Sequence, residues 1–449
     1  MQEIIFTLSY VILLISLTSG CSYNARANNS ISIDGPDVLL AAEGSNYKLK
    51  EIKNLKYDMC NWICYPNFCE LTDMGNEVYL KAFDINEETN ITLYCFIISE
   101  NENPITVKKI LSIKPRNDFP YIAYSLLFPG NIGNINLFDD VIFLAGGTCD
   151  FYRVPIRIPY ILSDSYLSSG GYYSHSYDIA VNNQYICTAE GDNGISIYPN
   201  DKKIFLPSSV NWKVDIDDYT ESIDIFNDYA LVAAWNTGLK IVDCSYDKKY
   251  FWPNENNRII KTIKTKTPAN EVKHYNGYAY LLCSDILYII DVDPANSAYI
   301  VNSISAPKNM GRDFEVMNGY LFYSSYTEPD NIGKIGVIDI SNPYQAHECN
   351  EYSFSKENTS VAFQDICVYN EDLYYISHSE EPEKLSEYEF GYELSVFKLE
   401  YKQNTGFKIE KKYALLTSCS PFSRGDQVCI KDHYLYLADA RSINIIRLH

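Results

Sequence analysis

The sequence predicts an all-β protein in which a small β-sandwich precedes a ring of repeated β-sheets. Two observations support this fold class. Short segments of alternating apolar and polar residues, separated by turn residues, run from Ile31 to the end of the chain, and one two-strand pattern recurs seven times after residue 118. The composition agrees, because 40 tyrosines and 20 phenylalanines favour strands over helices.

Length and charge limit the classes of function. A chain of 449 residues is too long for one ordinary compact domain, and 46% hydrophobic residues supply enough apolar area for a core. The formal charge of −21 argues against nucleic acid as a partner, since an acidic surface repels phosphates. Such a surface suits solubility, cationic ligands or metal ions, and solvation alone is the simplest interpretation.

The N-terminal segment predicts export. Ile4 to Leu17 is almost entirely apolar, which is too short to span a bilayer comfortably but suits the core of a signal peptide. The next residues, "LTSGC" ending at Cys21, resemble the lipobox of bacterial lipoproteins. The resemblance implies a signal peptide over 1–20, a lipidated Cys21 with a polar tether over 21–30, and an anchor in the cell envelope, at the outer membrane or cell surface. The alternative is an ordinary cleaved signal with an incidental cysteine.

Residues 31–115 predict a small sandwich. Segments such as "ISIDGPDVLL", "YDMCNWICY" and "NITLYCFIIS" alternate in the manner of short strands. With Trp62 on a middle strand, this region resembles the PKD-like and other Ig-like modules of bacterial surface proteins, which implies a spacer. We expect Trp62 in the core. Cys95 could reach Cys60 or Cys64, and most cysteines of the later region should be buried small hydrophobes.

Residues 116–449 contain a repeat. Each copy has a short apolar strand, an Asn or Asp turn and an aromatic-rich strand, as in "IDIFNDYALVA", and the copies recur at intervals of 42 to 62 residues. The turn residues are Asp139, Asn183, Asn227, Asn276, Asn318, Asn370 and Asp432. A hairpin of this kind, extended by two further strands, gives a four-stranded sheet that must stack on its neighbours.

Radial stacking of such sheets is a β-propeller, since it leaves only short exposed edges. We expect seven blades, with six or eight as alternatives. The last copy lacks a fourth strand, while Phe119 to Phe128 precedes the first copy without a hairpin partner. We therefore predict that this segment completes the last blade and closes the ring.

The third strands carry a motif. "GLKIVDC", "LYIIDV" and "IGVIDISNP" resemble the LVIVD repeat of bacterial surface proteins, whose repeats form propeller blades. Each motif ends on an aspartate before a turn, at Asp243, Asp291 and Asp339. A carboxylate there is expected to accept backbone N–H bonds, which is a structural role.

Two features are candidates for a site. The first is the residue just before the first strand of each copy, which would lie at the mouth of the central channel. These residues are Asn134, Asp178, Ser222, Glu271, Asp313, Asp365 and Gln427. As ligands, Asp178, Glu271, Asp313 and Asp365 would form an anionic funnel for a cation, with calcium as the candidate ion, or for a small polar ligand. As structural residues they would cap loop backbone.

The second feature is a pair of insertions on the same face, Ser324 to Lys334 and Ser377 to Glu393. Acidic residues there alternate with Tyr326, Tyr388 and Phe390, which could bind a basic partner or stack on sugar rings. Insertions without function are also common in surface loops.

We find no zinc or nucleophile motif that singles out catalytic residues, so the metal content is open and a binding role is favoured. The leading hypothesis is a monomeric envelope lipoprotein that binds a protein or glycan through its propeller. The alternative is a secreted polysaccharide hydrolase or lyase with its site at the channel mouth.

The lipobox resemblance predicts how the protein partitions. Wild-type protein should enter the detergent phase in a phase-separation assay, because an acyl chain on Cys21 adds membrane affinity. Cys21→Ser should give a soluble or uncleaved form. Wild-type protein found wholly in the aqueous phase would contradict lipidation.

Overall fold

The computed structural model describes residues 31–50, 59–99, 102–118, 121–128, 132–146, 151–156, 167–169, 176–200, 212–245, 258–306, 310–327, 332–355, 365–369, 372–379, 390–402, 406–419, 427–439 and 442–448. The predicted signal peptide, Cys21 and the tether lie outside these ranges. Within the ranges, no helix is both long and apolar enough to cross a membrane. The chain divides into two compact units, Met1–Asp118 and Phe119–His449.

The first unit consists of two four-stranded sheets around a common core. One sheet has the order β1-β3-β6-β5 and the other β2-β8-β7-β4. The strands are β1 (Ser32–Asp34), β2 (Val38–Leu40), β3 (Gly44–Lys50), β4 (Met59–Tyr65), β5 (Cys69–Asp73), β6 (Glu77–Ala82), β7 (Thr89–Ser99) and β8 (Glu102–Lys114).

Alternation along these strands builds the core. On β4, Cys60, Trp62 and Cys64 point inward while the residues between them are more exposed. The indole of Trp62 is 8% exposed, and its Nε1 donates to the backbone oxygen of Gly75 at 2.9 Å. The expectation that Trp62 is a core residue is confirmed.

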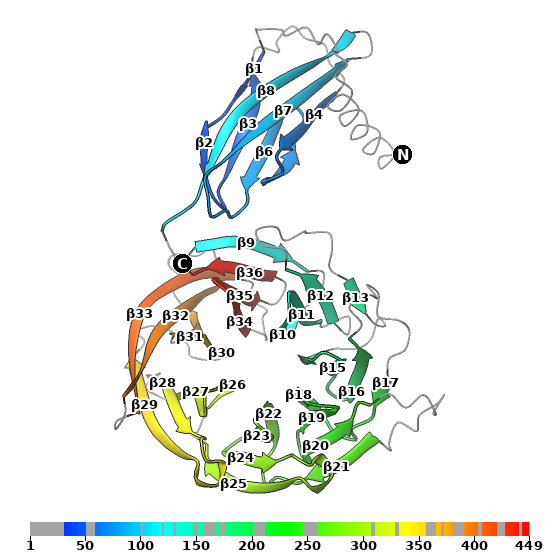
Figure 1. The fold of residues 1–449 in the computed structure, drawn as a ribbon, viewed down its shortest axis with the longest axis vertical. Coiled ribbons are helices and arrows are strands. Elements are labelled where there is room, and N and C mark those ends of the chain that lie inside the picture. Colours follow the sequence, from blue (N-terminus) through cyan, green and yellow to red (C-terminus); the bar gives the residue numbers. More distant parts are fainter. Residues whose placement is uncertain are drawn as a thin grey trace. The chain divides into compact units, whose positions relative to one another are not determined.

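In the second unit the described strands form seven four-stranded sheets, which are called blades 1 to 7 in chain order and are arranged in a ring (Figure 1). The first strand of each blade lies innermost. Blades 1 to 3 are β10 (Ile132–Phe138), β11 (Val141–Gly146), β12 (Phe151–Pro155) and β13 (Leu167–Ser169); β14 (Asp178–Val181), β15 (Tyr185–Ala189), β16 (Ile195–Pro199) and β17 (Trp212–Val214); and β18 (Thr220–Phe226), β19 (Tyr229–Ala234), β20 (Gly238–Asp243) and β21 (Ile259–Ile263).

Blades 4 to 7 repeat this order. They are β22 (Ala269–Tyr275), β23 (Tyr278–Cys283), β24 (Ile286–Asp291) and β25 (Tyr299–Ser305); β26 (Met310–Met317), β27 (Tyr320–Thr327), β28 (Ile332–Asp339) and β29 (His347–Ser355); β30 (Asp365–Tyr369), β31 (Asp372–Ser379), β32 (Phe390–Lys402) and β33 (Gly406–Cys419); and β34 (Gln427–Lys431), β35 (Tyr434–Asp439), β36 (Ser442–Arg447) and β9 (Tyr121–Leu127). The prediction of an all-β protein is confirmed. Two short 3₁₀ turns, η2 (Ala295–Ser297) and η3 (Pro343–Gln345), precede β25 and β29.

The predicted turn residues explain the hairpins. Five of them, Asp139, Asn227, Asn276, Asn318 and Asp432, have φ between 50° and 54°, the left-handed region that Asn and Asp tolerate best among residues with a side chain. In blades 4 and 5 the following glycine is also left-handed, so Asn-Gly supplies both residues of a type I′ turn.

The motif aspartates take the predicted structural role. The Oδ1 atoms of Asp243, Asp291 and Asp339 each accept the backbone N–H of the residue two positions later, at 2.8 Å, 3.1 Å and 2.9 Å. They therefore stabilise the turn after the third strand of blades 3, 4 and 5.

Successive side chains of a strand point to opposite faces of its sheet, so alternate residues pack against the blade on either side. On β19, Leu231 and Ala233 pack into the cluster shared with blade 4, while Ala230 and Val232 pack into the cluster shared with blade 2. All four residues have no measurable exposure. Each fully buried aliphatic side chain contributes about 1.5–3 kcal/mol, so stacking between blades is the main source of stability in this unit.

The ring closes as predicted from the spare strand. β9, which begins the unit, pairs antiparallel with β36, which ends it, and lies beside it as the outermost strand of blade 7 (Figure 1). Opposite Asn444, Ser125 adds a side-chain bond, with its Oγ donating to Oδ1 at 2.6 Å. The first and last strands of the second unit thus belong to the same sheet.

Two adjacent leucines of β9 give a matched test of closure. Leu126 is 5% exposed and Leu127 is 75% exposed. Leu126→Ala should lower the free energy of unfolding by about 2–5 kcal/mol, because it opens a cavity where β9 packs in the ring. Leu127→Ala should change it by less than about 0.5 kcal/mol. Denaturant unfolding measures both, and equal effects of the two variants would show that β9 does not close the ring.

Candidate functional site

In blades 1, 2, 3, 6 and 7, the side chain of the residue just before or at the start of the innermost strand accepts a hydrogen bond from a backbone N–H group. In blade 2, Asp178 is 5% exposed; its Oδ1 accepts the N–H of Ile179 at 2.7 Å, and its Oδ2 accepts the N–H of Ile223 in blade 3 at 2.7 Å. Asp178 therefore joins two blades through one carboxylate.

Asp365 repeats this geometry on the other side of the ring. It is 3% exposed, its Oδ1 accepts the N–H of Ile366 at 2.7 Å, and its Oδ2 accepts the N–H of Val428 in blade 7 at 2.7 Å. Because a carboxylate has two acceptor oxygens, one binds the N–H of its own strand and the other binds the N–H of the next blade.

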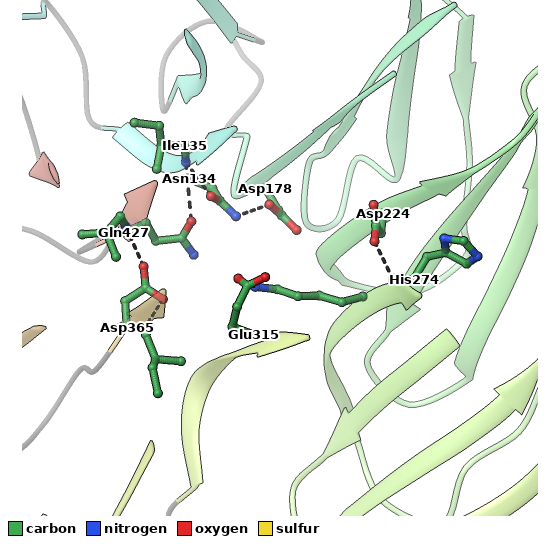
Figure 2. A network of polar contacts seen from close by, with 11 residues as sticks. Asn134, Ile135, Asp178, Asp224, His274, Glu315, Asp365 and Gln427 are labelled. Atoms are coloured by element: carbon green, nitrogen blue, oxygen red, sulfur yellow. Dashed lines mark hydrogen bonds and ion pairs between the residues drawn. The ribbon is translucent and has the colours of Figure 1, made fainter. Parts of the chain in front are cut away.

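In three other blades the residue at the same position also forms a hydrogen bond to the next blade, through a hydroxyl or an amide in place of a carboxylate. The hydroxyl of Ser222 in blade 3 accepts the N–H of Val272 in blade 4 at 3.2 Å. The amide of Asn134 in blade 1 donates to Asp178, and the Oε1 of Gln427 in blade 7 accepts the N–H of Ile135 in blade 1 at 3.5 Å. Figure 2 shows Asn134 facing Asp178, with Gln427 on the other side of Asn134 and Ile135.

Two predicted site residues fall at the remaining leading positions. Glu271 is half-buried on β22, where the register with β23 shifts between Ala269 and Glu271. A β-bulge of this kind changes the direction of the leading side chain, and the register of β10, β18 and β26 shifts at the same point. Asp313 lies on β26, and its side chain is outside the described part of the structure. The prediction that Asp178, Glu271, Asp313 and Asp365 bind a ligand stays a prediction.

A second polar layer lies two residues further along the inner strands. In blade 3 the carboxylate of Asp224 accepts the N–H of Ile225 at 2.7 Å and the N–H of His274 in blade 4 at 2.6 Å. Lys273 of blade 4 pairs with Glu315 of blade 5, with 3.6 Å between Nζ and Oε2. These contacts connect blades 3, 4 and 5 where Figure 2 places Asp224, His274 and Glu315.

Burial determines the protonation of this layer. Desolvation raises the pKa of Asp224 to about 6, although the two N–H bonds and Lys273 act in the opposite direction and Asp178 adds to the increase. Burial also lowers the pKa of His274, so the imidazole is neutral at pH 7. Among the described residues, no group of three or more His, Cys, Asp or Glu side chains is arranged to hold a metal ion.

The predicted insertions begin as strands. In blade 5 the ladder continues through Tyr326 opposite Gly333, and in blade 6 β32 starts at Phe390, opposite Cys419 of β33. Alternating aromatic residues favour extension of the hairpin, and residues 324–327, 332–334, 377–379 and 390–393 of the insertions are paired backbone. The side chains of Tyr326 and Phe390, and the whole of Tyr388, lie outside the described part of the chain.

Sequence reasoning missed an aromatic group on the face that carries these hairpin ends. Tyr177 and Tyr219 precede the first strands of blades 2 and 3, and Trp235 follows β19. The ring centroids of Tyr177 and Tyr219 are 5.5 Å apart, and those of Tyr219 and Trp235 are 5.6 Å apart at an interplanar angle of 82°. One indication of this group is present in the sequence: Tyr177 directly precedes Asp178, and Tyr219 lies three residues before Ser222, at similar points of the repeat.

The backbone under this group is firmly held. Oδ1 of Asp218 accepts the N–H of Tyr219 at 2.9 Å, and Oδ2 accepts the N–H of Thr237 at 2.7 Å. Despite the opposing effect of burial, these hydrogen bonds lower the pKa of Asp218. Trp235 remains 39% exposed and donates its backbone N–H to the oxygen of Tyr219 at 3.0 Å.

Comparison with known proteins identifies the fold of the second unit. The sequence matches no protein-family model and no curated protein. The structure is similar to the Cps50 (Swd1) β-propeller domain of Myceliophteria thermophila, with a TM-score of 0.50 and 10% identity over 74% of this chain and 100% of that chain. It is also similar to the WD40 β-propeller domain of Doa1, with a TM-score of 0.49 and 10% identity over 74% of this chain and 97% of that chain. The first similarity shows a β-propeller fold.

The hydrogen bonds of Asp178 predict a stability effect. Asp178→Ala should lower the free energy of unfolding by about 2–4 kcal/mol, because the N–H groups of Ile179 and Ile223 lose their acceptor in a buried site. Asp192→Ala, which removes an exposed carboxylate from the same blade, should change it by less than about 0.5 kcal/mol. Guanidinium unfolding distinguishes the two. If Asp178→Ala is as stable as Asp192→Ala, the carboxylate of Asp178 does not stabilise the ring, and a ligand-binding role would be favoured.

Proposed function

We propose that this protein is an exported, lipid-anchored binding module of the cell envelope. In this proposal the region 31–115 is an Ig-like spacer, the remainder is a seven-bladed propeller of LVIVD type, and the partner is a protein that presents a basic segment. The β-propeller fold supports the proposal in general terms, because a rigid scaffold with loops gathered on one face suits recognition.

The observation that carries the proposal is the aromatic corner of Tyr219 and Trp235. The two rings are close to perpendicular, and Trp235 is exposed. The contact is edge to face, and the exposed part of Trp235 leaves indole surface available to a cationic group; a cation–π contact contributes about 0.5–2 kcal/mol. Lysine, arginine and quaternary ammonium groups are the ligands that fit this chemistry.

Charge on the same face supports a cationic ligand. Burial first, then a hydrogen bond to Tyr177 and the negative charges of Glu221 and Asp192, raises the pKa of Tyr219. The same negative potential that opposes ionisation of Tyr219 attracts a cation. The formal charge of −21 extends this attraction over the molecule and would accelerate association with a basic partner.

The carboxylates at the channel favour binding over catalysis. A glycosidase needs one carboxylic acid and one carboxylate free to act on a substrate. Asp178, Asp224 and Asp365 each accept two backbone N–H bonds. This use of their oxygens argues against the polysaccharide hydrolase or lyase alternative.

The binding proposal can be tested with an oligolysine peptide. Wild-type protein at low ionic strength should bind the peptide in calorimetry, and the affinity should fall as salt is added. Trp235→Ala should weaken binding by about 2- to 30-fold, which corresponds to the loss of one cation–π contact. Tyr344→Ala is the matched control, since Tyr344 is 53% exposed but lies in the turn between β28 and β29, at the opposite ends of the strands.

Two results would contradict the proposal. Equal loss in the Trp235→Ala and Tyr344→Ala variants would show only diffuse attraction to an acidic surface. Binding of a neutral oligosaccharide in place of oligolysine, lost in Trp235→Ala, would assign the aromatic corner to a glycan.

A further inference from the structure

Two buried cysteines from neighbouring blades approach each other. Cys187 lies on β15 of blade 2, and Cys244 directly follows β20 of blade 3. Both have no measurable exposure, and their Sγ atoms are 3.8 Å apart. The two residues belong to one apolar cluster between the blades.

The backbone on both sides fixes this approach. Cys187 sits in the middle of a three-strand ladder, opposite Ala180 on one side and Ile197 on the other. Cys244 donates its N–H to the oxygen of Asp228 at 2.8 Å, which ties it to the hairpin of blade 3. The proximity of the sulfur atoms is therefore set by ordered elements and not by a loop.

The first unit contains two more pairs of cysteines. Cys60 and Cys95 lie on the adjacent strands β4 and β7, where Trp62 is opposite Cys95 and Cys60 is opposite Ile97, so the two cysteines are diagonal neighbours on the buried face.

Cys64 at the end of β4 and Cys69 at the start of β5 form the second pair. Both side chains are buried, and the Sγ of Cys64 donates to the backbone oxygen of Pro66 at 3.3 Å. Of the ten described cysteines, Cys187 and Cys244 bring their Sγ atoms into contact. Cysteines that served only as small hydrophobic residues would have no reason to meet in pairs.

We propose that Cys187 and Cys244 form a disulfide that joins blades 2 and 3. The proposal depends on the proposed function in one respect: export places the protein in an oxidising compartment, where a disulfide can form. A disulfide is about 2.05 Å long, so the sulfur atoms, which are 3.8 Å apart, must approach by nearly 2 Å when the bond forms.

The bond forms by oxidation of two thiols. The thiols lose two protons and two electrons, and a disulfide-containing donor accepts them and becomes a dithiol, through a mixed disulfide on one cysteine. Because Cys187 and Cys244 are inaccessible in the folded ring, this exchange must take place before blades 2 and 3 have docked.

The bond between blades would limit opening of the ring. Cys187 and Cys244 are 57 positions apart, so the bond closes a long loop in the unfolded chain and removes much of its entropy. It also adds a covalent link between two blades that are joined by apolar packing and by hydrogen bonds such as those of Asp178 and Thr220.

Refolding of the full chain tests the proposal without depending on export or on the proposed partner. The chain is denatured with dithiothreitol, refolded in buffer containing either reduced or mixed oxidised and reduced glutathione, alkylated, and digested for mass spectrometry. We expect peptides that link Cys187 to Cys244 only after oxidative refolding. The melting temperature of the oxidised wild type should exceed that of the reduced form by about 5–10 °C.

Two variants separate the disulfide from simple packing. In Cys187→Ala/Cys244→Ala the part of the redox-dependent shift due to this bond should disappear. Cys283→Ala, which removes another buried cysteine of the same unit, should keep both the linkage and the shift.

The proposal is overturned if wild-type protein that refolds with a cooperative thermal transition in oxidised glutathione still carries alkylated Cys187 and Cys244, or if either cysteine is linked elsewhere. Oligolysine binding measured on the reduced protein tests the proposed function separately, and its failure would leave the linkage result unaffected.

Discussion

The ring depends on one interaction, the capture of a backbone N–H of one blade by a side-chain oxygen of the preceding blade. Asp178, Ser222 and Asp365 make this contact at the narrowest part of the unit, where the inner strands converge. Apolar stacking between the sheets supplies most of the energy but is not directional. The hydrogen bonds fix the register between blades 2 and 3, 3 and 4, and 6 and 7, because a buried N–H without an acceptor is costly.

This constraint explains why several polar side chains of the inner strands are engaged within the protein. Charged residues near the centre are paired with backbone or with each other, as Asp224 is with the N–H of His274 and Lys273 is with Glu315. In the proposed function, recognition takes place at the outer surface of the same face, where Trp235 is exposed above a backbone held by Asp218. The polar contacts between the inner strands fix the positions of the blades, and these positions in turn fix where Tyr219 and Trp235 lie.

Local patterns in the sequence predicted the repeat well. Asn227 and Asn276 mark hairpins because few residues tolerate a left-handed φ, and the spare strand around Leu126 could be assigned because a four-stranded sheet lacked a member. The candidate site was harder to predict from the sequence. Whether Asp178 points to solvent or to the N–H of Ile223 depends on how neighbouring blades stack, which periodicity does not encode. The approach of Cys187 to Cys244 likewise joins positions that only the closed ring brings together.

Hydrogen exchange at single amides tests the central claim most directly. In the wild type, the N–H groups of Ile223 and Val428 should be as strongly protected as those of the inner strands, because Asp178 and Asp365 accept them across the boundaries between blades. In Asp178→Ala, protection should fall at Ile223 and remain at Val428. Rapid exchange of both amides in the wild type, or an unchanged rate at Ile223 in the variant, would contradict the claim that these carboxylates hold the ring together.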